Sequence, residues 1–179
     1  MLTFSLKHGF TVSDEILTAI GCTVVCQSHT ELQLGLLIHK LLDADYPKGC
    51  ALTAGMSFKQ LCTTVSALVA ETIGETDSRF QKVKELLGVL QRFEEFRNQA
   101  AHSVWAHGDE FNALTAKRIK TISRRNKKVQ HQSEAVELER ISEQITVAMD
   151  AHVKLVILVS AIAGKPVKGM EERDKAAQK

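Results

Sequence analysis

Four stretches of the chain place apolar residues three or four positions apart, which is the spacing of one face of an α-helix. These stretches cover residues 13–42, 57–74, 76–102 and 133–164. Each has a polar face opposite its apolar stripe, so each needs neighbouring helices to bury that stripe. The pattern therefore predicts an all-α protein built as a four-helix bundle.

Residues at the ends of these stretches support the expected boundaries. Ser13 is a natural N-cap for the first helix, and the second begins with the capping box Ser57-x-x-Gln60 and ends at Gly74. The fourth is expected to start near Ser133 and to stop at residues 164–166, where Gly and Pro occur. Between the first two helices, we expect a turn near residues 46–49.

Three segments do not follow the helical spacing. Residues 2–6 alternate apolar and polar positions, which predicts a short strand or N-terminal arm. Residues 117–131 alternate in part and predict either a small basic hairpin turning near Arg125-Asn126 or a basic loop before the last helix. The charged residues beyond 165 predict a flexible tail over 165–179. The sequence thus predicts a single helical domain over residues 1–164.

Length and composition place the chain among soluble globular proteins. It has 179 residues, of which 44% are hydrophobic and 25% charged. The longest apolar run, residues 155–164, is shorter than the roughly 20 residues that a bilayer requires. The N-terminus shows no basic segment followed by an apolar one. We therefore expect a cytoplasmic protein with no membrane partner.

The cysteines do not have the C-x-x-C spacing of a zinc site. Cys22, Cys26 and His29 have the i, i+4, i+7 spacing of one helix face and superficially resemble three metal ligands. We interpret them as small buried residues on an apolar face. The sequence therefore predicts no metal and no cofactor, and implies no structural disulfide.

Positive charge is concentrated in one segment. Residues 117–132 hold seven of the 23 basic residues and no acidic one, which leaves 16 basic against 21 acidic residues elsewhere. An uncompensated basic strip favours contact with nucleic-acid phosphates. The residues expected to make that contact are Arg118, Lys120, Arg124, Arg125, Lys127 and Lys128, with Trp105 as either a stacking platform or a packing anchor.

The end of the third stretch combines an Arg, an Asn and a His. Arg97 is suited to a phosphate and His102 to proton transfer near neutral pH. Asn98 lies one helical turn before His102 and is expected to orient its ring. Arg97 and His102 diverge by roughly 140° around an ideal helix. They meet at one phosphate only if the helix ends between them or a second subunit completes the site, so the spacing favours a dimer.

The pattern Arg97-Asn98-x-x-x-His102 late in a helix resembles the R-x(4–6)-H motif of the HEPN superfamily. The resemblance implies a dimeric helical bundle that is often a metal-independent ribonuclease. It implies that Arg97 stabilises the phosphate, His102 acts as general acid or base, and Asn98 orients His102. Many toxin members have Tyr two residues after the His, where this chain has Val104, so the properties that depend on Tyr are not carried over.

Three functional hypotheses remain open from the sequence. The first is an RNA-binding homodimer that cleaves RNA by transesterification. The second is a non-catalytic dimerisation, signalling or nucleotide-binding module, in which Arg97 and His102 complement the helix dipole or cap carbonyls. The third is a toxin whose basic segment is covered by an acidic antitoxin-like protein.

Overall fold

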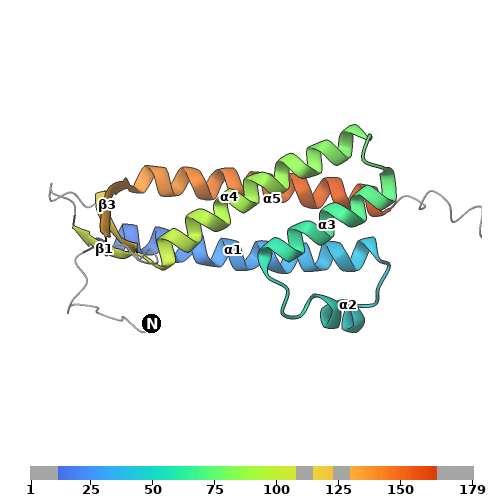
Figure 1. The fold of residues 1–179 in the computed structure, drawn as a ribbon, viewed down its shortest axis with the longest axis horizontal. Coiled ribbons are helices and arrows are strands. Elements are labelled where there is room, and N and C mark those ends of the chain that lie inside the picture. The colour runs from blue at the N-terminus through green and yellow to red at the C-terminus, as the bar shows by residue number, and fades with distance from the viewer. Residues whose placement is uncertain (1–11, 108–114, 123–129, 165–179) are drawn as a thin grey trace, which may run out of the picture. The chain divides into compact units, whose positions relative to one another are not determined.

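The computed structural model describes residues 12–107, 115–122 and 130–164, and these are mostly helical (Figure 1). The predicted helical character is confirmed, but a short helix and a three-stranded sheet are added to it. The elements in chain order are α1 (Asp14–Leu41), α2 (Tyr46–Thr53), α3 (Phe58–Ile73), α4 (Ser78–Ala101), β1 (Val104–His107), β2 (Thr115–Ile122), β3 (Gln130–Glu137) and α5 (Leu138–Ala163).

The predicted capping box at the start of α3 is confirmed. The Ser57 backbone N–H donates to Gln60 Oε1 at 2.8 Å, and the Gln60 N–H donates to Ser57 Oγ at 3.3 Å. The helix ends before Gly74, whose φ of 87° is a conformation that side chains disfavour. The two signals fix this helix at both ends.

The turn expected at residues 46–49 is wrong, because these residues begin helix α2. Asp45 is its N-cap and accepts a hydrogen bond from the Lys48 N–H at 3.0 Å. Pro47 lies in the first turn, where its missing N–H costs nothing. Lys48 holds the pKa of the Asp45 carboxyl below its ordinary value through side-chain and backbone hydrogen bonds. The Pro-Gly pattern therefore marks a helix start.

The start expected for the last helix near Ser133 is also wrong. Residues 130–137 form strand β3, and α5 begins at Leu138. Pairing with β2 gives these residues hydrogen-bond partners that a helix would otherwise supply, and places Val136 in the core. Of the two alternatives for the basic segment, the structure shows the hairpin strands, while its connection at 123–129 lies outside the described residues.

The sheet has the order β1-β2-β3 with both pairs antiparallel. Ala116 and Val136 are register partners and both are buried. Because side chains alternate across a strand, Arg118 and Glu134, which are also partners, project from the same face as Ala116 and Val136. The opposite face bears Val104, which is 66% exposed. The face of the sheet that bears Ala116 and Val136 therefore packs against the core.

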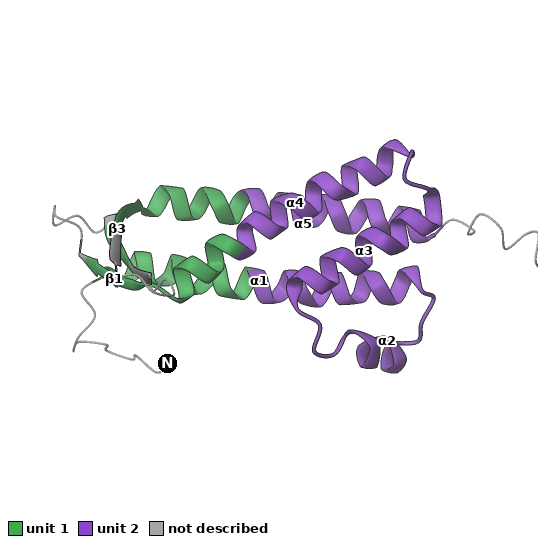
Figure 2. Ribbon diagram, in the orientation of Figure 1, with its two compact units in different colours: residues 1–26, 95–146 green, residues 27–94, 147–179 purple. Residues whose placement is uncertain are grey.

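The chain divides into two compact units, each described by itself, and α1, α4 and α5 contribute residues to both (Figure 2). Unit 1 comprises residues 1–26 and 95–146 and contains the sheet. Its core joins the sheet to the first turns of α1 and α5. The buried members of this core are Val12, Ile16, Ala19, Ala116, Val136 and Ile141, with Phe96, Trp105 and other partly buried side chains packed against them.

Unit 2 comprises residues 27–94 and 147–179, and within its described part it is helical. Each of the four long helices contributes buried apolar side chains to it. Representative members are Ile38 of α1, Val65 of α3, Leu90 of α4 and Val159 of α5, all fully buried. Unit 2 therefore has an apolar core supplied by helices, while a four-helix bundle stays a prediction.

The structure leaves the two predicted end segments and the absence of a membrane segment as predictions. The N-terminal arm at residues 2–6 and the tail at 165–179 lie outside the described residues. Helix α5 has 26 residues and, by length and composition, is apolar enough to cross a membrane, with 33% of its most apolar window buried inside the protein. The apolar run 155–164 covers only part of this helix, so its length alone understated the apolar segment. The absence of a membrane segment therefore stays a prediction.

We predict opposite effects for alanine at two helical glycines. A Cβ at Gly49 would lie 2.3 Å from Cγ of His39, whereas a Cβ at Gly21 would meet no atom within 4 Å. Gly49→Ala should lower the free energy of unfolding by about 1–3 kcal/mol through overpacking. Gly21→Ala should raise it by about 0.5–1 kcal/mol through helix propensity. Urea denaturation measures both, and equal effects would contradict the close His39–Gly49 contact.

Candidate active site at the end of helix α4

The residues of the predicted Arg–Asn–His site lie at the end of helix α4. Arg97 and Asn98 belong to its last turns and are half-buried, and His102 follows the final helical residue and is exposed. The His102 backbone N–H donates to the Asn98 carbonyl oxygen at 3.1 Å, so helical hydrogen bonding continues as far as His102. The imidazole is therefore presented to solvent from a fixed backbone.

The same geometry keeps Arg97 and His102 apart around the helix axis. Because the backbone stays helical up to His102, the two residues retain the divergence of roughly 140° that five residues produce. The expected side-chain hydrogen bond from Asn98 to the His102 ring does not occur, although the structure describes both residues. Their hydrogen bond joins backbone atoms only. One chain alone thus does not direct both side chains at one phosphate.

Trp105 acts as a packing anchor in this structure. Its indole Nε1–H donates to the Ala100 carbonyl oxygen at 2.8 Å, and the ring packs against the core of unit 1. The Ser103 hydroxyl donates to the Gln99 carbonyl oxygen at 2.5 Å. These two side chains satisfy carbonyls that the end of a helix leaves without an intrahelical partner. Together they fix the direction in which the chain leaves α4, and so the position of His102.

Arg118 connects the basic hairpin to helix α4. Its Nη1 donates to Gln99 Oε1 at 2.9 Å, and its Nη2 donates to Glu134 Oε2 at 2.5 Å. Its side chain is only 13% exposed. Arg140 of α5 donates to the other Glu134 oxygen at 2.6 Å. The charge of Arg118, expected to contact nucleic acid, is therefore already offset inside the fold.

The other residues expected to contact nucleic acid lie outside the described part of the structure. The side chain of Lys120 and the whole of Arg124, Arg125, Lys127 and Lys128 lie outside what the structure describes. Lys117, on the same strand, is half-buried on the outer face of the sheet. The position of the strands nevertheless shows where the basic connection begins. Strand β2 ends at Ile122, directly before residues 123–129, and Arg118 of the same strand is hydrogen-bonded to the last turn of α4.

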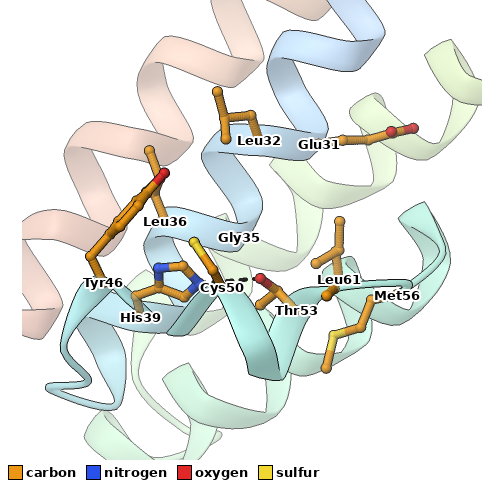
Figure 3. A pocket seen from close by; sticks show the side chains of 11 residues that line it. Glu31, Leu32, Gly35, Leu36, His39, Tyr46, Cys50, Thr53, Met56 and Leu61 are labelled. Atoms are coloured by element: carbon orange, nitrogen blue, oxygen red, sulfur yellow. Dashed lines mark hydrogen bonds between the residues drawn. The ribbon is translucent and has the colours of Figure 1, made fainter. Parts of the chain in front are cut away.

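A pocket in unit 2 contains residues that the sequence did not single out. Its volume is about 250 Å³, and its polar lining residues include His39, Tyr46, Cys50 and Thr53 (Figure 3). His39 lies in the first predicted helical stretch, residues 13–42, and was assigned no role of its own. His39 is buried. Because helix α2 forms where a turn was expected, a thiol and a phenol lie in the same pocket as His39. The N-cap and proline at residues 45–47 were the available signal.

Cys22, Cys26 and His29, which have the spacing of three metal ligands, are less buried than expected. Cys22 and His29 are exposed and Cys26 is half-buried, so the interpretation as buried residues is wrong for two of them. Partial burial, then the neighbouring Cys22, raise the pKa of Cys26. Within the described part of the chain, no group of three or more His, Cys, Asp or Glu side chains is arranged to hold a metal ion.

Comparison with known proteins gives no relative for this chain, since no family model, curated protein or solved structure matches it.

The ion pair at Arg118 generates a prediction about acid stability. Hydrogen bonding to Arg140, together with the charges of Arg118 and Arg140, lowers the pKa of Glu134. A carboxyl whose folded pKa is lowered stabilises the fold above its unfolded pKa of about 4.3, and this stabilisation is lost as pH falls through the folded pKa. Glu134→Gln should therefore lower the free energy of unfolding at pH 7 by about 1 kcal/mol, a figure reduced by partial exposure.

The difference between wild type and Glu134→Gln should shrink when denaturation is repeated below pH 4. Glu137→Gln is the matched control, because Glu137 is an exposed residue of the same strand that projects from the opposite face. A pH-independent difference, or an equal loss in the control, would show that Glu134 does not act through its charge.

Proposed function

We propose that this protein is an RNA-binding, HEPN-like helical bundle that acts as a homodimer and cleaves RNA at the end of helix α4. The observation that carries the proposal is the hydrogen bond from Arg118 to Gln99. It joins two features that are separate in the sequence, the basic segment and the helical turn that bears Arg97 and Asn98. A phosphate backbone bound along the hairpin would thus lie near the Arg–His motif.

The proposed reaction is transesterification within the RNA. The 2′-oxygen attacks the neighbouring phosphorus as His102 takes its proton or protonates the departing 5′-oxygen, and a 2′,3′-cyclic phosphate is left. Arg97 offsets the negative charge that builds on the phosphate. His102 suits this role because its ring is exposed while its backbone is held by α4. The basic segment contributes binding that does not depend on RNA sequence.

The proposed dimer follows from the divergence of Arg97 and His102 in one chain. If two copies pack through their α4 ends, Arg97 of one copy can face His102 of the other, and twofold symmetry gives two such composite sites. This arrangement uses the helical geometry as it stands and requires no unwinding of the last turn.

The first test is incubation of the purified protein with total RNA. We expect wild type to produce 2′,3′-cyclic phosphate ends and His102→Ala to lose at least about a hundredfold in rate, as expected for general acid–base catalysis. The control is His29→Ala, which removes an exposed histidine of the other unit and should leave the rate unchanged. RNA binding without cleavage by wild type would favour the non-catalytic module, and cleavage by both histidine variants would contradict the site.

The second test distinguishes a composite site from a site within one chain. Arg97→Ala and His102→Ala should each be inactive, but a mixture that exchanges subunits should recover activity. Half of the dimers would be mixed and each would hold one intact site, so about a quarter of the wild-type rate is expected. A mixture as inactive as its components, with subunit exchange verified by mass spectrometry, would contradict the composite site.

A further inference from the structure

The pocket of unit 2 lies where helix α2 packs beside the second half of α1 (Figure 3). Its volume is about 250 Å³, whereas an apolar cavity of about 150 Å³ already holds a benzene molecule. Much of the wall is apolar, with Leu32, Leu36, Met56 and Leu61 among the lining residues. The pocket is therefore large enough for a small, mainly apolar molecule.

The hydrogen bonds around His39 define its tautomer. The Thr53 hydroxyl donates its hydrogen to the Gly49 carbonyl oxygen at 3.1 Å. Thr53 Oγ1 is therefore an acceptor towards His39 Nε2, which lies 3.2 Å away. Because a neutral imidazole carries one N–H, placing it on Nε2 leaves a basic lone pair on Nδ1.

That lone pair has no use within the described fold. His39 is 7% exposed, and its Nδ1 is buried without a hydrogen-bond partner among the described residues. Leaving a buried acceptor unsatisfied costs the fold free energy. The cost is informative, because such groups occur where a protein uses them for chemistry or binding.

Cys50 is the cysteine among the residues that line the same pocket. The missing side chain of Gly49 lets the backbone of α2 lie against the His39 ring, and the next residue carries a half-buried thiol into the same pocket. Figure 3 shows Cys50 and His39 among the side chains that line this pocket. Hydrogen bonding with Cys50 raises the pKa of Tyr46, whose phenol lines the same pocket. A base that shares a pocket with a thiol is the arrangement that activates a cysteine nucleophile.

The other thiols have different surroundings. Burial raises the pKa of Cys62 to about 12, with a further contribution from Glu94, so that thiol stays protonated. Partial burial and Cys22 raise the pKa of Cys26. Cys22 is exposed on α1 and does not line this pocket, so it serves as a reference for an accessible thiol.

We propose that Cys50 is a nucleophilic thiol that undergoes thiol–disulfide exchange with small, uncharged disulfides bound in the pocket of unit 2. His39 Nδ1 accepts the proton of the Cys50 thiol, and the Cys50 sulfur attacks one sulfur of the disulfide. A bond between Cys50 and that sulfur forms as the original S–S bond breaks. The departing sulfur takes the electron pair of the broken bond and the proton from His39. The products are a mixed disulfide on Cys50 and one free small thiol.

Reaction of the full chain with 2-hydroxyethyl disulfide tests the proposal, with each cysteine quantified by peptide mass spectrometry. At pH 7 an ordinary thiol is only a few per cent ionised, so activation by His39 should make Cys50 react about tenfold faster than Cys22, or more. His39→Gln retains an amide N–H near the position of Nε2 but removes Nδ1. It should slow Cys50 about tenfold and leave the rate at Cys22 unchanged.

Two results would overturn the proposal. The first is a wild-type protein in which the exposed Cys22 reacts as fast as Cys50, which requires no variant and so does not depend on how His39→Gln folds. The second is a folded His39→Gln protein in which Cys50 keeps its wild-type rate. Tyr46→Phe provides a further check, since Tyr46 is 64% exposed and its loss should slow Cys50 without unfolding the pocket.

Discussion

The buried guanidinium of Arg118 is the group that joins the sheet to the end of helix α4. A guanidinium this buried requires partners for its charge, and Glu134 across the sheet and Gln99 on the helix supply them. Arg140 shares the same carboxylate and extends the network to α5. The Trp105 hydrogen bond closes the end of α4 beside it. A basic residue that the sequence assigns to nucleic acid thus holds the sheet to the helix that carries His102.

Unit 2 uses a different constraint, the close contact of Gly49 with the His39 ring. A residue without a side chain allows α2 to approach α1, and the approach brings Thr53 within hydrogen-bond distance of His39. The Thr53 hydroxyl is already committed to the Gly49 carbonyl, so the same turn of helix that contacts the imidazole also fixes its tautomer. The two units therefore carry separate polar arrangements, one built on an ion pair and one on a buried histidine.

Local sequence signals predicted the long helices. The structure differs from the prediction where contacts with residues distant in the sequence determine the secondary structure. The capping box at Ser57 and the stop at Gly74 act within one turn of helix, so the sequence is sufficient to find them. Strand β3 was mistaken for the start of a helix because its stability comes from pairing with β2, which periodicity within 130–137 does not reveal. Helix α2 was missed because Gly49 suggests a turn, while its N-cap Asp45 and Pro47 favour a helix.

The sequence by itself determined the helical class, the ends of α3, the basic segment and the residues of the Arg–Asn–His motif, because each is a matter of spacing or composition along the chain. Only the tertiary structure decided that Arg118 is paired with Glu134 and that Trp105 closes helix α4. It also brought His39 and Cys50 into one pocket. The physical reason is that burial and hydrogen-bond partners depend on which helices and strands are in contact. Those contacts are made between segments that are distant in the sequence.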